Sequence, residues 1–213
     1  SGSGKSTVVQ AMMRILAPPA VISEGKVFIN NKNIMNSSKS DIIGLRWKQI
    51  SIVMQSALNA LNPVLSVRDQ IFDVLSTHKG LVGKNADDRA KELLSLVDID
   101  FIHLESYPHQ LSGGMKQRIV IAIALAIMPP IIIMDEPTTA LDVIVEREII
   151  AKIIELRKEL GITILFITHD LNLLMEFADR LAIMKNGEIV ELDKVKDIQK
   201  GGKHSYTKKL IGS

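Results

Sequence analysis

The sequence predicts an α/β fold in which a mostly parallel β-sheet lies between layers of helices. Three short apolar runs, at residues 50–54, 131–134 and 162–168, lack the alternation of a half-exposed strand, so we expect both of their faces to be buried. Helical segments separate these runs along the chain, which is the order typical of parallel sheets. With 213 residues, of which 46% are hydrophobic, the chain can form a sizeable core.

Composition excludes several classes of protein. The 26 Lys and Arg residues nearly balance the 24 Asp and Glu residues, which argues against a nucleic-acid partner bound by bulk charge. No cysteine is present, so disulfides, thiolate zinc sites and a cysteine nucleophile are excluded, in keeping with a reducing compartment. The apolar stretch 119–134 is split at Pro129-Pro130 and is too short for the roughly 20 residues of a spanning helix. We therefore expect a soluble protein without a signal peptide, able to dock on a membrane protein.

The first quarter of the chain predicts a helix, a strand, a turn and a second strand. The helix begins in the glycine-rich start and continues to about Leu16, where Pro18-Pro19 ends it. Residues 25–30 alternate like a strand and lead into a turn at Asn30-Asn31. The apolar run 50–54 is the second strand.

Residues 66–105 differ from the rest of the chain because they carry no strand pattern. Two amphipathic stretches, 67–76 and 86–97, have the spacing of helices. We therefore predict a helical subdomain at 66–105, inserted into a core domain made of residues 1–65 and 106–213.

The second half of the chain returns to alternating helices and strands. Gly161 is expected to stop the longest helix, and Lys185-Asn186-Gly187 predicts a tight turn between the last two strands. The expected elements are helices at 112–128 and 143–160, strands at 131–134 and 162–168, a short helix, and strands at 180–184 and 188–191.

The chain opens on Ser1-Gly2-Ser3-Gly4-Lys5-Ser6-Thr7, the end of a phosphate-binding loop of the pattern G-x-x-x-x-G-K-[ST]. The glycines let backbone N–H groups turn toward phosphate oxygens, and the following helix directs its positive end at the same anion. Lys5 would contact the β- and γ-phosphates, and the Ser6 hydroxyl would reach Mg²⁺. The sequence thus predicts a P-loop NTPase core.

A second candidate site is the acidic pair Asp135-Glu136, directly after the apolar run 131–134. Two adjacent carboxylates are costly to ionise unless a cation is near. Asp135 is therefore placed to bind Mg²⁺ through water, and Glu136 to polarise the attacking water. A solvated acidic turn is the alternative interpretation of the pair taken alone.

The third motif is Leu111-Ser112-Gly113-Gly114-Met115, at the start of a predicted helix. Ser112 is a good N-cap, but two glycines directly after a cap are poor helix formers, which makes sense if a phosphate approaches the backbone closely. Here the sequence resembles the ATP-binding subunits of ABC transporters, in which this motif closes over the nucleotide held by the other subunit. Met115, where Gln is commoner, is similar to the oligopeptide/dipeptide/nickel branch.

The resemblance extends over nearly the whole chain and implies three more functional residues. Gln55 corresponds to the glutamine that touches Mg²⁺ or the attacking water and reports to the transmembrane partner. Asp142, in Ala140-Leu141-Asp142, corresponds to the D-loop at the dimer interface, and His169 to the histidine that contacts the γ-phosphate. Further similarity to the peptide branch lies in Asn59-Ala60-Leu61-Asn62-Pro63, Tyr107-Pro108-His109 and His204-Ser205-Tyr206-Thr207.

The resemblance implies an ATPase subunit of an importer for peptides, nickel or related solutes, with ATP and Mg²⁺ as cofactors. Its implied partners are transmembrane permease subunits, a second ATPase subunit, identical or a sister chain, and indirectly an extracellular solute-binding protein; no nucleic acid is expected. Its implied place is the cytoplasmic face of the cell membrane. The rival interpretations are a soluble ABC-type ATPase of DNA repair or translation, and an inactive fragment of the transporter subunit.

Two departures from the family pattern concern the ends of the chain. The first glycine of the phosphate loop, the strands that precede it and the aromatic residue that stacks on adenine would all lie before Ser1, so we expect a sheet that lacks its N-terminal strands. Trp47 lies in the wrong order to replace the adenine-stacking residue and is expected to serve packing. The cysteine-containing C-terminal extension common in the peptide branch is not found in these 213 residues.

Overall fold

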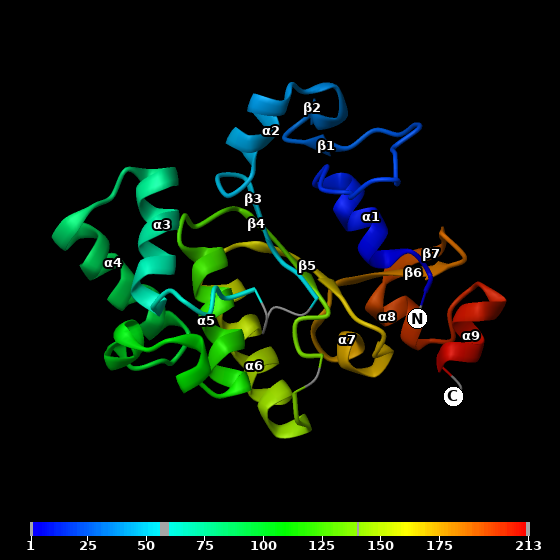
Figure 1. Cartoon of the computed structure of the whole chain (residues 1–213). Helices are drawn as coiled ribbons and strands as arrows, with labels where there is room; N and C mark the ends of the chain where they lie inside the picture. Colours follow the sequence, from blue (N-terminus) through cyan, green and yellow to red (C-terminus); the bar gives the residue numbers. More distant parts are fainter. Residues whose placement is uncertain (1, 56–59, 140, 212–213) are drawn as a thin grey trace. The chain divides into compact units, whose positions relative to one another are not determined.

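The computed structural model describes residues 2–55, 60–139 and 141–211. They form two compact units, one made of residues 1–37 and 167–213 and the other of residues 38–166 (Figure 1).

The unit 38–166 is built on a three-stranded sheet. Strands β3 (Ile50–Val53), β4 (Ile131–Asp135) and β5 (Thr163–Ile167) lie in the order β3-β4-β5, with β4 in the centre. β3 and β4 are parallel, so their carboxyl ends meet at one edge of the sheet. The predicted α/β fold with a parallel sheet and helices is confirmed.

The burial of these strands agrees with the prediction for two of the three. β3 and β4 are buried along nearly their whole length. In β5 exposed positions alternate with more buried ones, and Leu165 is 39% exposed. The expectation that both faces of this strand are buried is therefore wrong for β5, because the positions of Thr163 and Leu165 on one face are exposed.

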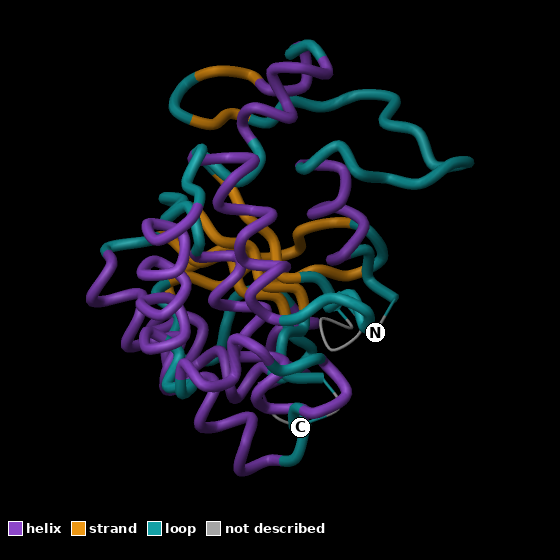
Figure 2. The backbone as a smooth tube through the Cα atoms, turned by 60° about the vertical axis from the view of Figure 1, so that its left-hand side comes forward, coloured by secondary structure: helices purple, strands orange, loops and turns teal. Residues whose placement is uncertain are grey.

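In the described part of this unit five α-helices accompany the sheet, and two of them begin directly after candidate site residues. α5 (Gly113–Leu125) packs against β3 and against α6 (Val143–Leu160), and α6 ends where Gly161 adopts a left-handed φ of 63°. The other helices are α2 (Lys39–Leu45), α3 (Val67–Lys79) and α4 (Gly83–Leu96). Figure 2 shows the helices of the chain in purple and its strands in orange.

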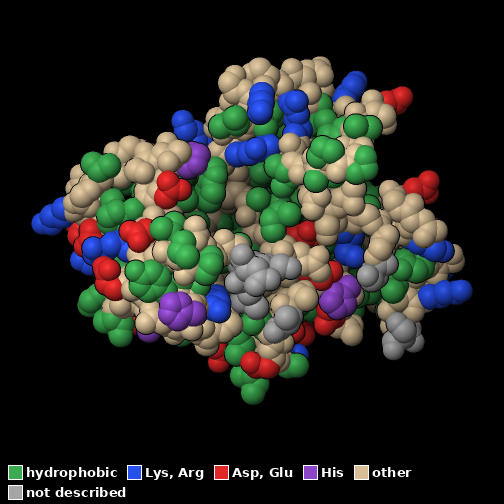
Figure 3. Space-filling view, viewed as in Figure 1, with side chains coloured by type: hydrophobic (Ala, Val, Ile, Leu, Met, Phe, Trp, Pro, Cys, Tyr) green, Lys and Arg blue, Asp and Glu red, His purple; other side chains and the backbone are tan. Residues whose placement is uncertain are grey.

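The segment 66–105 is helical, as its amphipathic runs predict. α3 begins with a capping box formed by Ser66 and Asp69, and the segment ends in a 3₁₀ helix, η3 (Phe101–Glu105). Asp87 of α4 pairs with Arg68 of α3 and, at 2.6 Å, with Lys91. Figure 3 shows such acidic and basic side chains interspersed over this part of the surface.

Trp47 serves packing, as expected from its position in the sequence. Its ring stacks on that of His78 in α3, with 5.4 Å between the ring centroids and 27° between the planes. The indole therefore joins the segment before β3 to the helical part of the same unit.

The second unit contains two β-hairpins. β1 (Phe28–Ile29) pairs antiparallel with β2 (Lys32–Asn33), and β6 (Arg180–Lys185) pairs antiparallel with β7 (Glu188–Lys194). Both turns are those that the sequence predicts: Asn30 and Asn31 have φ of 48° and 62°, and Asn186 and Gly187 have φ of 50° and 84°. Each hairpin forms a two-stranded sheet of its own.

Two predicted boundaries in this unit are wrong. The first helix, α1 (Lys5–Met12), stops short of Leu16 because Arg14 adopts a positive φ of 52°. The predicted strand 25–30 is reduced to β1, because only Phe28 and Ile29 find a partner strand. The remaining helices are η1 (Ile34–Asn36), α7 (Leu171–Phe177), α8 (Val195–Gln199) and α9 (Ser205–Ile211).

A buried carboxylate joins β7 to the last helix of this unit. Glu191, 8% exposed, accepts hydrogen bonds from the backbone N–H of Lys203 at 2.8 Å and of His204 at 3.0 Å. The Thr207 hydroxyl and these N–H groups lower the pKa of Glu191 below its ordinary value. Glu191 thus ties the segment before α9 to β7, together with the ion pair between Lys203 and Asp193.

Among the described residues, no helix has both the length and the apolar character needed to cross a membrane.

Candidate functional site

The phosphate loop leads directly into the first turn of α1. Gly2 and Gly4 adopt left-handed φ values of 80° and 90°, which residues with a side chain rarely reach. Gly4 is the N-cap of α1, so Lys5, Ser6 and Thr7 occupy the first helical positions, where backbone N–H groups have no acceptor within the helix. This is the arrangement that anion binding at a helix N-terminus requires. Ser1 lies outside the described residues.

The turn between β6 and β7 supports this loop. The backbone N–H of Gly187 donates to the carbonyl oxygen of Ser3 at 3.1 Å. A Cβ placed on Gly4 would lie 3.7 Å from Cα of Gly187, so the two glycines are in van der Waals range. The sequence predicts the turn, but not that it is the neighbour of the phosphate loop.

Gln55 and Glu136 meet at the carboxyl edge of the sheet. Gln55 follows β3 and Glu136 follows β4, and the register opposes Val53 to Met134. The side-chain amide of Gln55 donates to Oε2 of Glu136 at 3.1 Å, across 81 residues of sequence. The Thr139 hydroxyl donates to the same oxygen at 3.0 Å. The parallel pairing thus brings together two residues that the sequence singles out separately.

Asp135 is the last residue of β4 and is 1% exposed. It stands directly before Glu136, so a buried carboxylate and a half-buried one are neighbours at the sheet edge. Carboxylate and amide oxygens are hard ligands of the kind that Mg²⁺ prefers. The side chains of Asp135 and Gln55 therefore suit a magnesium ion.

The glycines of the Leu-Ser-Gly-Gly motif pack against the segment that starts α6. Ser112 caps α5 by accepting a hydrogen bond from the N–H of Met115 at 3.3 Å. A Cβ on Gly113 would lie 3.3 Å from Cδ2 of Leu141, and one on Gly114 would lie 2.7 Å from Cγ1 of Val145. The sequence attributes both glycines to the approach of a phosphate. The structure adds a second reason, which is the close approach of two elements within one chain.

Asp142 is the N-cap residue of α6, next to the residues that the glycine motif approaches. Its carboxylate caps α6 by accepting hydrogen bonds from the N–H groups of Ile144 at 3.1 Å and Val145 at 3.0 Å. Leu141 and Val145, on either side of Asp142, are the residues that the glycine motif approaches. Ala140 lies outside the described residues, as does Asn59 of the segment that resembles the peptide branch.

His169 is exposed and lies between β5 and α7 in the other unit. The hydroxyl of Thr168 accepts a hydrogen bond from the N–H of Asp170 at 3.1 Å, and Asp170 in turn caps α7. These two bonds hold the backbone on both sides of the histidine. The unit that contains His169 also contains the phosphate loop, Gly2–Thr7.

Two residues of this region were not singled out by sequence reasoning. Thr139 binds Glu136, and Val145 packs on Gly114. A hydroxyl three residues after Glu136 was the available signal for Thr139. No sequence signal indicates Val145, because its contact partner is set by how α5 and α6 pack.

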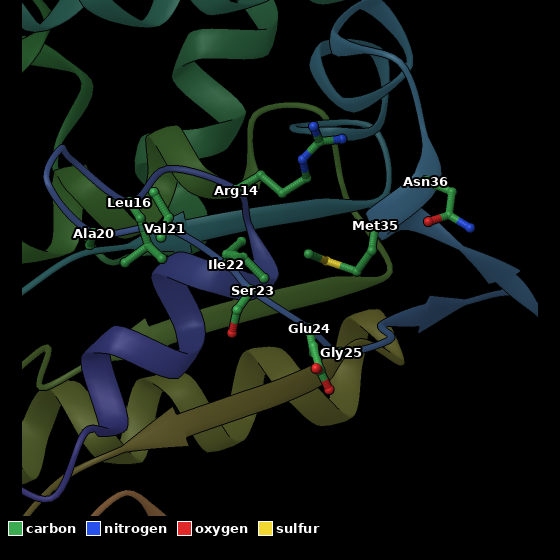
Figure 4. A pocket seen from close by; sticks show the side chains of 10 residues that line it. All are labelled: Arg14, Leu16, Ala20, Val21, Ile22, Ser23, Glu24, Gly25, Met35 and Asn36. Carbon is green, nitrogen blue, oxygen red and sulfur yellow. The ribbon is translucent and has the colours of Figure 1, made fainter.

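A cavity of about 440 Å³ lies in the unit that contains the phosphate loop (Figure 4). None of the residues that line it is a predicted site residue. Most, from Arg14 to Gly25, belong to the connection between α1 and β1, and Met35 and Asn36 of η1 complete the wall. The guanidinium of Arg14 donates to the carbonyl oxygen of Ser37 at 2.6 Å, so this side chain has a structural role.

The sequence matches a known protein family and close relatives within it. The ABC transporter family matches residues 1–139. The dipeptide transport ATP-binding protein DppD of Bacillus subtilis is 42% identical over the whole chain, which covers 64% of that relative. The oligopeptide transport ATP-binding protein OppD of the same organism is 40% identical, again over the whole chain and 60% of the relative. The chain thus spans somewhat less than two thirds of the length of these relatives.

Solved structures of ATP-binding cassettes are also similar to this chain. The dimeric ATP-binding cassette MJ0796, in a post-hydrolysis state bound to ADP and Pi, is 32% identical with a TM-score of 0.77, over 91% of this chain and 82% of that one. The protein cbiO1 from Clostridium perfringens, part of the transporter complex cbiONQ, is also 32% identical, with a TM-score of 0.79 over 99% of this chain and 78% of that one.

Proposed function

Because the chain belongs to the ABC transporter family, we propose that it binds and hydrolyses ATP to drive an importer of peptides, or of nickel or a related solute. The observation that carries this proposal is the contact between Gln55 and Glu136 at the carboxyl edge of the sheet, beside the buried Asp135. An amide and two carboxylates at one sheet edge are what the activation of a water molecule next to a phosphate-bound cation needs.

Each predicted site residue has a role in this proposal. Gly2–Thr7, with Ser1 before them, cradle the phosphates of ATP, and the Lys5 ammonium balances the charge on the β- and γ-phosphates. The oxygens of Ser6, Gln55 and Asp135 would hold Mg²⁺, which when bound neutralises phosphate charge. Glu136 orients and activates the water that attacks the γ-phosphate, and His169 contacts that phosphate.

A second ATPase subunit completes each site in this proposal. Ser112, Gly113 and Gly114 of one subunit would close over the ATP held by the other, and Asp142 would lie at the interface between them. The cassette MJ0796 was solved as a dimer, which supports this arrangement. We propose that residues 66–105 form the helical subdomain that carries Ser112, and that residues 1–65 and 106–213 form the ATPase core.

The proposed partners beyond the second subunit are transmembrane permease subunits at the cytoplasmic face of the membrane, with a solute-binding protein acting through them. The relatives are named as transport subunits for dipeptides and oligopeptides, which favours peptides as the cargo. They give no support to a role in DNA repair or translation.

The test is ATP hydrolysis by the full-length protein with and without the Lys5→Ala substitution. The loss of one contact to the developing charge lowers kcat by about 10²–10³-fold. Lys84→Ala removes a lysine from the exposed start of α4 and is the matched control, which retains wild-type turnover. A Lys5→Ala protein with more than about a tenth of wild-type turnover contradicts the assignment. Uptake of a labelled dipeptide and of nickel ion by the complete transporter then identifies the cargo.

A further inference from the structure

The carboxylate of Glu136 receives two side-chain donors on one oxygen. Oε2 accepts from Nε2 of Gln55 at 3.1 Å and from Oγ1 of Thr139 at 3.0 Å. The backbone N–H of Thr139 also donates to the carbonyl oxygen of Glu136 at 3.3 Å. Thr139 is exposed, so its hydrogen bond to Glu136 is not a consequence of core packing.

The backbone turns at Glu136, directly after the end of β4. β4 ends at Asp135, and Glu136 adopts a φ of 47°, which lies in the left-handed region that a residue with a side chain seldom occupies. The chain therefore turns sharply at this residue. The direction of its side chain is therefore set by this turn and not by the regular strand geometry of β4.

We propose that Thr139 is a positioning residue for Glu136 in the hydrolysis of ATP, an inference that rests on the proposed function. A carboxylate is planar, so two donors on Oε2 also determine the direction in which Oε1 points. That direction decides where an attacking water is held and which way its proton leaves. Thr139 thus orients Glu136 without touching the substrate.

The two donors differ in how firmly they are placed. The Gln55 side chain has several rotatable bonds and loses more conformational entropy when it is held. Threonine is branched at Cβ and restricted about one torsion, and Thr139 is tied by its backbone N–H to the residue that it orients. The threonine is therefore the donor whose geometry is set before the substrate arrives.

The experiment compares kcat and KM for ATP in the full-length protein with Thr139→Val, which keeps the shape and removes the hydroxyl, and with Thr139→Ser, which restores it. We expect Thr139→Val to lower kcat about 10- to 100-fold, because a misplaced catalytic group costs rate, while KM stays as in the wild type. Thr139→Ser recovers most of the loss. Thr77→Val, which removes an exposed hydroxyl from α3, is the matched control.

The outcomes separate this inference from the proposed function. If Glu136→Gln abolishes turnover but Thr139→Val hydrolyses ATP like the wild type, the positioning role is wrong and the proposed function stands. An equal loss in the Val and Ser variants, or a fall in melting temperature that parallels the loss of kcat, also overturns it. Thr139→Ala provides the same comparison if the valine variant does not fold. If the wild-type protein releases no phosphate, both the proposed function and this inference are wrong.

Discussion

Replacing Gly114 by alanine tests the packing of the glycine motif against the start of α6. The new Cβ would lie 2.7 Å from Cγ1 of Val145, closer than carbon atoms approach without a shift of one of them. Val145 is branched at Cβ and lies in the first turn of α6, where it has little rotamer freedom. Either this side chain or the backbone of α5 must therefore move.

The size of the effect follows from two opposing contributions. Overpacking costs about 1–3 kcal/mol, whereas replacing a helical glycine by alanine gains about 0.5–1 kcal/mol. Gly114→Ala should thus destabilise the fold by about 1–2 kcal/mol, or lower Tm by about 2–8 °C. Gly113→Ala, whose Cβ would lie 3.3 Å from Leu141, should be nearly neutral. Gly44→Ala in α2 meets no atom within 4 Å and should be stabilising.

The assay is thermal unfolding of the three full-length variants, together with ATP hydrolysis. Adding Val145→Ala to Gly114→Ala removes the clashing methyl group, so the double variant should recover the stability lost through the clash. We expect its turnover to stay low, because in the proposed function a phosphate also approaches this backbone. A Gly114→Ala protein that melts with or above the wild type refutes the packing argument. Full recovery of turnover in the double variant refutes the phosphate argument.

Three other predictions concern charged groups. Glu136→Gln should bind ATP, fail to hydrolyse it and accumulate as a dimer in gel filtration with ATP and Mg²⁺; normal turnover contradicts its role. Folding lowers the pKa of Glu191, so its ionised carboxylate stabilises the folded state at neutral pH. This stabilisation is lost as the pH falls through the pKa that Glu191 has in the folded protein. Glu191→Gln should therefore lower Tm near about pH 7, with a difference that shrinks below about pH 4; a constant difference contradicts this. Asp98, which pairs with Arg118 at 3.6 Å and Lys152 at 2.9 Å, has a φ of 55° that Asn tolerates. Asp98→Asn should thus cost about 1 kcal/mol in urea unfolding, and an unchanged midpoint contradicts the pairing.

Much of the fold could be predicted because local patterns and global packing agree. The limits of α6 follow from its apolar period and from Gly161, and both hairpin turns follow from residues that accept a positive φ. The predictions failed where a partner element decides the outcome. The strand predicted at 25–30 shrinks to two paired residues, and one face of β5 is exposed although its sequence has no alternation.

The sequence by itself determined the chemistry of the candidate residues. Charge, acidity and glycine spacing are properties of the covalent chain and do not depend on how it folds. They are enough to single out Lys5, Asp135, Glu136 and His169. The same holds for the family, which rests on motifs in order along the chain.

The tertiary structure alone decided which of these residues touch. Gln55 and Glu136 are 81 residues apart, and only the parallel register of β3 and β4 brings them to hydrogen-bonding distance. Thr139 and Val145 gain their significance in the same way, from a sharp turn after β4 and from the packing of α5 on α6. Contacts between distant segments depend on how elements pack, and side-chain packing is a property of the whole unit rather than of any local stretch.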